Sequence, residues 1–143
     1  MKQFFLDGAP VPFEDGDTLM AAATRAGHQV PHLCWHPQLA PSGACRLCTV
    51  QVDGRMTAAC TTRASEGLEV HNHTPELTAL RRQLTQMLFV EGNHYCPGCE
   101  KSGNCELQST AYALGMADMR HELLMPQRPV DASHPDLWLD HNR

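Results

Sequence analysis

The sequence has few aromatic residues, no long apolar run and no excess of positive charge. Aromatic side chains make up 6% of the 143 residues, so the core must rely on Leu, Val, Ala and Met. The formal net charge of −5 gives no electrostatic footprint for nucleic acid or an anionic membrane. No apolar stretch approaches the roughly 18–20 residues of a membrane-spanning helix. We therefore expect neither a nucleic-acid-binding protein nor an integral membrane protein.

The N-terminus lacks the pattern of a secretory signal. Residues 1–8 contain one basic residue and then turn polar, without an apolar core and a small-residue cleavage site. This pattern predicts a cytoplasmic protein. A reducing compartment argues against structural disulfides, and seven cysteines would leave one unpaired in any disulfide framework. The cysteines are therefore interpreted as metal ligands.

No catalytic constellation for substrate chemistry is present. The sequence has no Gly-rich dinucleotide loop in a strand–helix setting, no nucleophile–base pair and no flavin-binding signature. Gly98, Gly103 and Gly115 do not form such a loop. We expect no catalytic residue on this chain, so that any chemistry is carried by bound groups.

The composition that is present, 42% hydrophobic and 19% charged, is typical of a globular protein. In the first half, Asp-Gly turns and helix-capping residues separate short apolar segments. They predict strands Gln3–Leu6 and Pro10–Phe13, a helix over 19–26 begun by Asp17 or Thr18 and ended by Gly27, strands 47–52 and 56–59, and a strand 67–70. This order predicts a small mixed sheet with one helix packed across it.

The second half reads as helical. Thr74 and Pro75 predict the start of a long helix that ends near Glu91. Its apolar face is expected to pack in the core and consists of Leu77, Leu80, Leu84, Met87 and Leu88. A short helix is predicted over 107–114, stopped by Gly115, and the chain is Pro-rich and irregular from Met125 onward.

Four cysteines in the first half follow the pattern C-x10-C-x2-C-x11-C: Cys34, Cys45, Cys48 and Cys60. The two residues between Cys45 and Cys48 let both sulfurs turn toward one metal centre, and the small Gly43 before them allows a tight loop. Spacing alone leaves three alternatives open, namely an iron–sulfur cluster, a four-thiolate zinc site and unliganded buried cysteines.

The other three cysteines, Cys96, Cys99 and Cys105, lie in one loop of the second half. Three thiolates are one short of a [4Fe–4S] set, and a neutral imidazole can supply the fourth ligand. His94 is the nearest candidate. Seven cysteines and one histidine then make eight ligands, which are two complete sets of four.

The segments 31–37 (PHLCWHP), 43–50 (GACRLCTV) and 59–60 (AC) resemble the N-terminal domain of the complex I 75-kDa subunit family. This family includes the small diaphorase subunit of NAD-reducing and bidirectional [NiFe]-hydrogenases. The resemblance implies an α+β fold that begins with a β-grasp, ferredoxin-like domain. It also implies that one [2Fe–2S] cluster is bound by Cys34, Cys45, Cys48 and Cys60.

The segment 96–108 (CPGCEKSGNCELQ) resembles the [4Fe–4S] segment of the same family. The resemblance implies a small, mostly helical second domain whose cluster is bound by His94, Cys96, Cys99 and Cys105. Most of the family places the histidine four residues before the first cysteine, where this chain has Gly92. The string 91–96 instead resembles the hydrogenase diaphorase subunits. His71 and His73 are the alternative ligands.

These resemblances imply three regions: a [2Fe–2S] domain at 1–74, a [4Fe–4S] domain at 75–120 and an irregular extension at 121–143. They imply an electron-transfer subunit of an NAD(H)-linked oxidoreductase, whose partners are a flavin- and NAD(H)-binding diaphorase subunit and hydrogenase subunits. The same subunit of complex I or of an NAD-dependent formate dehydrogenase is an alternative, and a zinc-stabilised interaction module is another.

In the resembling diaphorase subunits, the region equivalent to 140–143 is followed at once by a cysteine-rich segment for two further [4Fe–4S] clusters. This sequence stops before that segment. We interpret the end as a truncation at a domain boundary, and a naturally short subunit is the alternative.

Overall fold

The computed structural model describes residues 2–140 and 142, so Met1, His141 and Arg143 of the predicted regions lie outside the described residues. The chain divides into two compact units, Met1–Leu84 and Thr85–Arg143. The division falls within helix α2, which runs from Pro75 to Glu91. The α+β class expected from the sequence is confirmed, and each unit is described by itself below.

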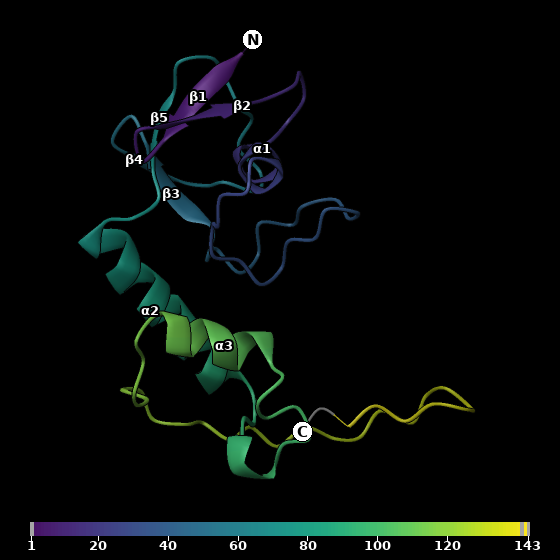
Figure 1. The fold of residues 1–143 in the computed structure, drawn as a ribbon. Helices are drawn as coiled ribbons and strands as arrows, with labels where there is room; N and C mark the ends of the chain where they lie inside the picture. The colour runs from purple at the N-terminus through teal and green to yellow at the C-terminus, as the bar shows by residue number, and fades with distance from the viewer. Residues whose placement is uncertain (1, 141, 143) are drawn as a thin grey trace. The chain divides into compact units, whose positions relative to one another are not determined.

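The first unit is built on one five-stranded mixed sheet with the strand order β2-β1-β5-β3-β4 (Figure 1). Strands β1 and β5 are parallel, whereas the other neighbouring strands are antiparallel. The strand bounds are β1 Gln3–Leu6, β2 Ala9–Pro12, β3 Thr49–Val52, β4 Arg55–Ala58 and β5 Glu69–His71. This sheet is the mixed sheet that the sequence predicts.

Two Asp-Gly turns set the register of the two hairpins. Asp7 and Gly8 have φ angles of 50° and 83°, and Asp53 and Gly54 have φ angles of 48° and 77°. Two consecutive positive φ angles define the tight turn that matches the twist of paired strands. The first turn pairs Leu6 directly with Ala9. Strand β2 therefore begins one residue earlier than the sequence pattern predicts.

Helix α1 (Leu19–Arg25) supplies much of the core of this unit. The side-chain oxygen of Thr18 accepts a hydrogen bond from the backbone N–H of Ala21 at 3.2 Å, which caps the helix. Leu19 and Met20 are 2% and 0% exposed. Burying each such side chain stabilises a fold by about 1.5–3 kcal/mol. The same core contains residues of the sheet and of the cysteine segments: Phe4, Leu6, Val11, Cys48, Val50, Cys60 and Val70.

Strand β2 lies at one edge of the sheet, and Pro10 and Pro12 lie within it. Both prolines are exposed, whereas Val11 between them is fully buried. Proline has no backbone N–H to donate, so it fits a strand only where that side of the strand has no partner. The edge position of β2 is consistent with this requirement.

Helix α2 begins as the sequence predicts. The side-chain oxygen of Thr74 accepts a hydrogen bond from the backbone N–H of Leu77 at 3.1 Å, and Pro75 is the first helical residue. Leu77 is fully buried, but Met87 is 61% exposed. The expectation that the whole apolar face packs in the core is therefore wrong at Met87.

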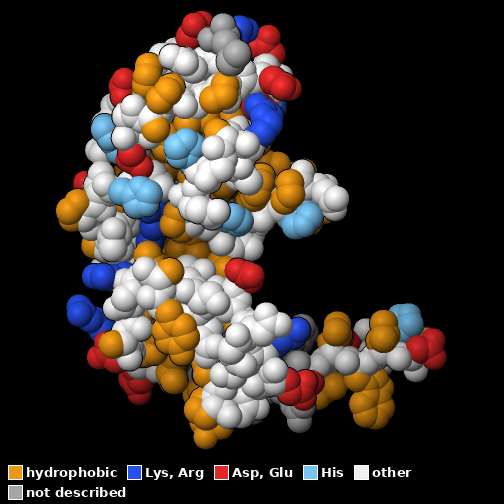
Figure 2. Space-filling model, in the orientation of Figure 1, with side chains coloured by type: hydrophobic (Ala, Val, Ile, Leu, Met, Phe, Trp, Pro, Cys, Tyr) orange, Lys and Arg blue, Asp and Glu red, His pale blue; other side chains and the backbone are white. Residues whose placement is uncertain are grey.

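The second unit contains the 3₁₀ helix η1 (Cys96–Gly98) and helix α3 (Glu106–Ala113). Its C-terminal part has little regular structure, and Asp131 and Leu139 form an isolated antiparallel bridge there. Large hydrophobic side chains are exposed along this part (Figure 2): Val130, Leu137, Trp138 and Leu139. In the part of the chain that the structure describes, no helix is both long and apolar enough to span a bilayer.

The Asp7 carboxylate ties the first turn to the segment after β5. It accepts hydrogen bonds from the backbone N–H of Asn72 at 2.8 Å and from Nδ1 of His73 at 2.8 Å. Burial raises the pKa of Asp7, but these hydrogen bonds outweigh burial and hold the pKa below its ordinary value. A group with a lowered folded-state pKa stabilises the fold above its unfolded-state pKa, and this contribution is lost as the pH falls through the folded value.

We therefore expect Asp7→Asn to lower the midpoint of thermal unfolding at pH 7, and the difference from the parent chain to shrink between about pH 5 and pH 3. The measurement is anaerobic thermal unfolding of both proteins at each pH. Asp53→Asn, in the corresponding turn of the second hairpin, is the matched control. An Asp7→Asn difference that stays constant with pH would contradict the assignment.

Candidate metal centres

The first group of cysteines lies around one end of the sheet. Cys34 and Cys45 come from the long connection between α1 and β3, which contains no helix or strand (Figure 1). Cys48 directly precedes β3, and one residue, Ala59, separates the end of β4 from Cys60. Cys48 and Cys60 are 0% exposed, whereas Cys34 and Cys45 are half-buried. The loop thus carries the two half-buried cysteines, and the two fully buried cysteines belong to the core.

Hydrogen-bond donors gather around the sulfur of Cys34. The backbone N–H of Cys45 donates to this Sγ at 3.4 Å. Burial raises the pKa of Cys34, but hydrogen bonds from the Cys45 backbone, the Ser42 side chain and the Ala44 backbone outweigh burial and lower the pKa to about 7. The loop is therefore arranged to stabilise a thiolate, which is the form that binds metal.

Cys48 is more deeply buried than Cys34. Burial raises the pKa of this thiol to about 11, and the neighbouring thiols of Cys60 and Cys34 act in the same direction, while the backbone N–H of Cys60 opposes them. These interactions place Cys34, Cys48 and Cys60 in one neighbourhood, and the Cys45 hydrogen bond adds the fourth cysteine. The four cysteines of the first predicted set thus lie in one region of the first unit, and their role as ligands stays a prediction.

The donor set fits a two-iron cluster. Within residues 2–140 and 142, no three His, Cys, Asp or Glu side chains lie close enough to hold a single metal ion. In a [2Fe–2S] cluster each iron would take two of the four thiolates, so the four sulfurs need not surround one metal ion. Such a cluster is stabilised by hydrogen bonds to sulfur and by burial. Here a backbone N–H donates to one of the four sulfurs, and two of the four thiols are fully buried.

Gly43 lets the loop pass close to the residue after Cys60. Its φ angle is +65°, and a Cβ at this position would lie 3.2 Å from Cγ2 of Thr61. An L-residue in this backbone region costs about 1–2 kcal/mol. We expect Gly43→Ala to lower the free energy of unfolding by more than this backbone cost and to shorten the lifetime of the cluster, because both strain and contact are introduced beside Cys45.

The matched control is Gly54→Ala, since Gly54 also has a positive φ angle, +77°, but no atom lies within 4 Å of its added Cβ. Chemical denaturation of the cluster-loaded chains under argon measures both losses. Adding Thr61→Ser to Gly43→Ala removes the Cγ2 methyl and should recover the excess loss. Equal destabilisation by Gly43→Ala and Gly54→Ala would contradict the role given to the Thr61 contact.

The second group of cysteines lies in the loop between α2 and α3. Cys96 opens η1, Cys99 directly follows it, and Cys105 precedes α3. Two short turns hold this loop, because the backbone N–H of Cys99 donates to the carbonyl of Cys96 and the N–H of Ser102 donates to the carbonyl of Cys99. Cys99 is exposed, and Cys96 and Cys105 are half-buried.

Gln108 closes this loop onto helix α3. Its Oε1 accepts a hydrogen bond from the backbone N–H of Gly103 at 2.7 Å, and its Nε2 donates to Oγ of Ser102 at 3.3 Å. The chain between Cys99 and Cys105 is thus attached to the first turns of the helix that follows. These hydrogen bonds therefore restrain the distance between Cys99 and Cys105.

The ring of His94 lies over Gly92. A Cβ at residue 92 would lie 2.8 Å from Nε2 of His94, and the His94 ring packs edge-on against Phe89 with ring centroids 5.4 Å apart. Gly92 occupies the position where most of the resembling family carries its histidine. Because Gly92 has no side chain, the imidazole of His94 occupies the space beside residue 92.

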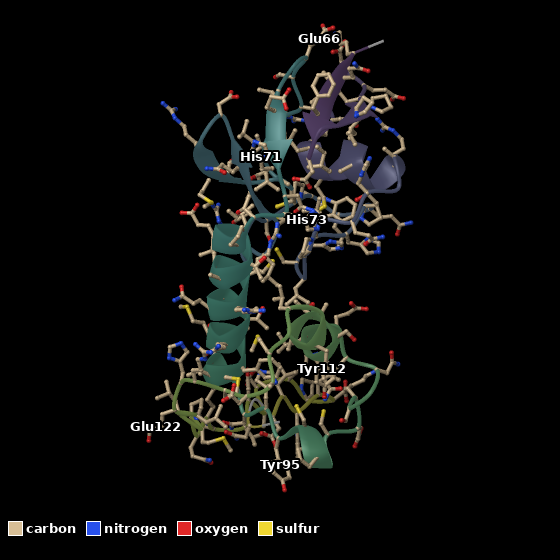
Figure 3. All side chains as sticks on the ribbon, turned by 60° about the vertical axis from the view of Figure 1, so that its left-hand side comes forward. Glu66, His71, His73, Tyr95, Tyr112 and Glu122 are labelled. Atoms are coloured by element: carbon tan, nitrogen blue, oxygen red, sulfur yellow. The ribbon has the colours of Figure 1, made fainter. Side chains whose placement is uncertain are left out.

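The alternative histidines belong to the first unit, whereas the three cysteines of the second group belong to the second unit. Figure 3 shows His71 at the end of β5 and His73 just beyond it. Nδ1 of His73 lies 2.8 Å from Oδ2 of Asp7, so this ring nitrogen already has a partner. His94 belongs to the same unit as Cys96, Cys99 and Cys105 and is the histidine nearest to them in sequence.

Sequence reasoning missed two polar residues beside the first group. Arg81 and Asn72 are 2% and 1% exposed, and Nη2 of Arg81 donates to Oδ1 of Asn72 at 2.7 Å. The sequence does contain a pattern that could have identified Arg81 as a buried residue, because Arg81 lies four residues after Leu77 on the apolar face of α2. A charged residue at such a position is rarely buried without a specific partner.

Two family models match the chain. The 2Fe-2S iron–sulfur cluster binding domain matches residues 1–75, and the NADH-ubiquinone oxidoreductase-G iron–sulfur binding region matches residues 81–120. The matches follow one another in the order in which the two groups of cysteines occur. The chain therefore carries one region for a [2Fe–2S] cluster and one for a [4Fe–4S] cluster, as the sequence predicts.

Known relatives match most or all of the chain. The gamma subunit of the NAD-reducing hydrogenase HoxS of Cupriavidus necator is 42% identical over 99% of this chain and 60% of its own length. The alpha subunit of the NADPH-Fe(3+) oxidoreductase of Geobacter sulfurreducens is 30% identical over 100% of this chain but only 17% of its own length. A G-type subunit of the NADH-quinone oxidoreductase of Rhizobium meliloti is 36% identical over 84% of this chain and 14% of its own length. The chain therefore spans less than two thirds of each of these relatives.

A solved structure has the same fold. A chain in the crystal structure of an NAD⁺-reducing [NiFe]-hydrogenase in the H₂-reduced state matches with a TM-score of 0.90 and 52% identity, over 97% of this chain and 59% of that chain. The resemblance to the hydrogenase diaphorase subunits is confirmed. The chain belongs to the family of 2Fe-2S iron–sulfur cluster binding domains, followed here by the iron–sulfur binding region of NADH-ubiquinone oxidoreductase-G.

Proposed function

We propose that this chain is the iron–sulfur electron-transfer part of an NAD(H)-linked oxidoreductase. It would relay electrons between a flavin- and NAD(H)-binding subunit and a hydrogenase centre on partner subunits. The observation that carries the proposal is the position of the loop with Cys34 and Cys45 beside the β3 and β4 ends that carry Cys48 and Cys60, with a backbone N–H directed at the Cys34 sulfur. The matching family models support the cluster types, and the 42% identity to a hydrogenase subunit supports the hydrogenase assignment.

The ligands of the first cluster are proposed to be Cys34, Cys45, Cys48 and Cys60. When bound, a [2Fe–2S] cluster accepts and releases one electron. The chain supplies the surroundings for this exchange: Cys48 and Cys60 anchor the site in the core, where water is excluded. The backbone N–H of Cys45 and the side chain of Ser42 stabilise negative charge on the Cys34 sulfur.

The ligands of the second cluster are proposed to be His94, Cys96, Cys99 and Cys105. The η1 turn and the start of α3 fix the cysteines, and the ring contact with Phe89 orients the imidazole. A neutral imidazole adds no charge where a thiolate would add one. This choice of ligand raises the reduction potential relative to a four-cysteine site.

The two clusters are proposed to divide the chain into domains at 1–74 and 75–120, with an extension at 121–143. We also infer a cytoplasmic location. The inference rests on the interpretation of the seven cysteines as iron ligands and not as disulfide partners, which suits a reducing compartment. As a subunit, the chain would take part in an oxidoreductase reaction without substrate chemistry of its own.

Anaerobic purification from the native host tests the proposal. The protein should be brown, hold about six irons and six acid-labile sulfides per chain, and travel with a flavoprotein and a hydrogenase subunit. A quinone-linked complex in the same fraction would instead favour the complex I alternative. Colourless material that holds zinc would contradict the proposed function.

A further inference from the structure

Arg81 is a buried cation beside the first group of cysteines. It lies on α2, within the unit Met1–Leu84, and is 2% exposed. Its guanidinium donates hydrogen bonds to three residues of the first unit: Nε to the carbonyl of Leu47 at 3.0 Å, Nη1 to the carbonyl of Asn72 at 2.7 Å, and Nη2 to the carbonyl of Thr49 at 2.8 Å and to Oδ1 of Asn72 at 2.7 Å. The planar fork of arginine suits such convergent acceptors, and a lysine ammonium could satisfy fewer of them.

The hydrogen bonds of Arg81 restrain the backbone around Cys48. Leu47 and Thr49 are the residues directly before and after Cys48, so the guanidinium is hydrogen-bonded to the backbone on both sides of this cysteine. Cys48 itself is fully buried and belongs to the proposed ligands of the first cluster. Asn72, which follows β5, is fixed to the same point. Loss of the guanidinium would therefore release the loop-to-strand junction at Cys48.

The charge of Arg81 acts at the same place. Arginine stays protonated in proteins, so the guanidinium is a permanent positive charge. Burial lowers the pKa of Arg81, and the negative charges of Cys48 and Asp7 oppose this change. Four thiolates and a cluster bring net negative charge into the core, and reduction adds one more electron without making or breaking a bond. A fixed positive charge nearby favours the reduced form.

We propose that Arg81 positions Cys48 and, through its buried positive charge, raises the reduction potential of the [2Fe–2S] cluster. This inference rests on the proposed function, because it requires the cluster at Cys34, Cys45, Cys48 and Cys60. Positioning and charge make different predictions for different substitutions. Arg81→Lys keeps the charge and loses part of the hydrogen-bond fork, whereas Arg81→Gln loses the charge as well.

The experiment is an anaerobic redox titration of the full chain with dithionite and mediator dyes, followed by the electron paramagnetic resonance signal of the reduced [2Fe–2S] cluster. Arg81→Gln should shift the reduction equilibrium toward the oxidised form by about tenfold, which is ~59 mV for one electron. Arg81→Lys should keep most of the parent potential while lowering the thermal unfolding midpoint. Arg82→Gln removes the same charge from an exposed position of the same helix and is the matched control.

A second variant guards against loss of folding in Arg81→Gln. Asn72→Asp has nearly the same shape, keeps an oxygen acceptor for Nη2 of Arg81 and loses the Nδ2 hydrogen bond to the carbonyl of Gln29. Its carboxylate places a negative charge beside the guanidinium and offsets the positive charge felt by the cluster, so it should also lower the potential. Parent-like potentials in Arg81→Gln or in Asn72→Asp would overturn the inference and leave the proposed function intact. An equal fall in Arg81→Lys and Arg81→Gln would overturn the role of charge. A parent chain without a [2Fe–2S] signal would overturn both proposals.

Discussion

Replacing Cys48 by alanine should empty the first iron–sulfur site and leave the second intact. Cys48 is fully buried and directly precedes β3, and the structure places Cys34 and Cys60 close enough to affect its pKa. Three remaining thiolates cannot complete the coordination of two irons. The iron content should fall from about six to about four per chain, with loss of the [2Fe–2S] resonance signal but not of the [4Fe–4S] signal.

The matched control is Val50→Ala, which opens a cavity at another fully buried position near the start of β3 without removing a thiolate. This variant should lose stability and keep its iron. In the reciprocal variant, Cys99→Ala, the iron should fall to about two per chain. If Cys48→Ala lost both clusters while Val50→Ala kept both, the division of the eight ligands into two independent sites would be wrong.

The second large effect is expected at His94. Replacement by cysteine puts a thiolate in place of a neutral imidazole and adds one negative charge to the cluster surroundings. A His94→Cys chain that assembles its cluster should therefore show a lower [4Fe–4S] potential, by at least about tenfold in the reduction equilibrium, or ~59 mV. His94→Ala should lose the normal [4Fe–4S] signal, because one iron would lack the protein ligand proposed for it. Redox titration followed by resonance spectroscopy measures both results.

The position of the His94 ring over Gly92 offers a sharper control. The double variant Gly92→His, His94→Gly moves the imidazole to the place that most of the resembling family uses and should restore the parent signal. His71→Ala and His73→Ala should leave the [4Fe–4S] signal unchanged, since both residues belong to the first unit. Loss of the signal in either of these two variants, with retention in His94→Ala, would reassign the ligand.

The elements could be predicted where local chemistry decides them. The Asp7-Gly8 and Asp53-Gly54 turns adopt the positive φ angles that this dipeptide favours, and Thr74 caps α2 as expected. Strand β3 begins later than predicted, at Thr49. Arg46 adopts a left-handed φ of 59° and its carbonyl accepts a hydrogen bond from the N–H of Thr49, so the chain is still turning at Cys48.

Contacts between distant segments could not be predicted in the same way. The hydrogen bonds from Arg81 to Leu47 and Thr49 join residues that are separated by 34 and 32 positions in the sequence. The amide directed at the Cys34 sulfur comes from Cys45, 11 positions away. No local pattern encodes such pairs, because they depend on how the loop folds over the sheet. The cysteines were expected as ligands, but the groups that hold them required the structure.

The prolines of β2 bear on self-association. An exposed sheet edge with a full row of amide donors invites strand addition from another copy and, from there, aggregation. Pro10 and Pro12 remove two of these donors, so a second chain could not continue the hydrogen-bond ladder along β2. These two residues therefore protect this edge of the sheet against strand addition by another copy of the chain.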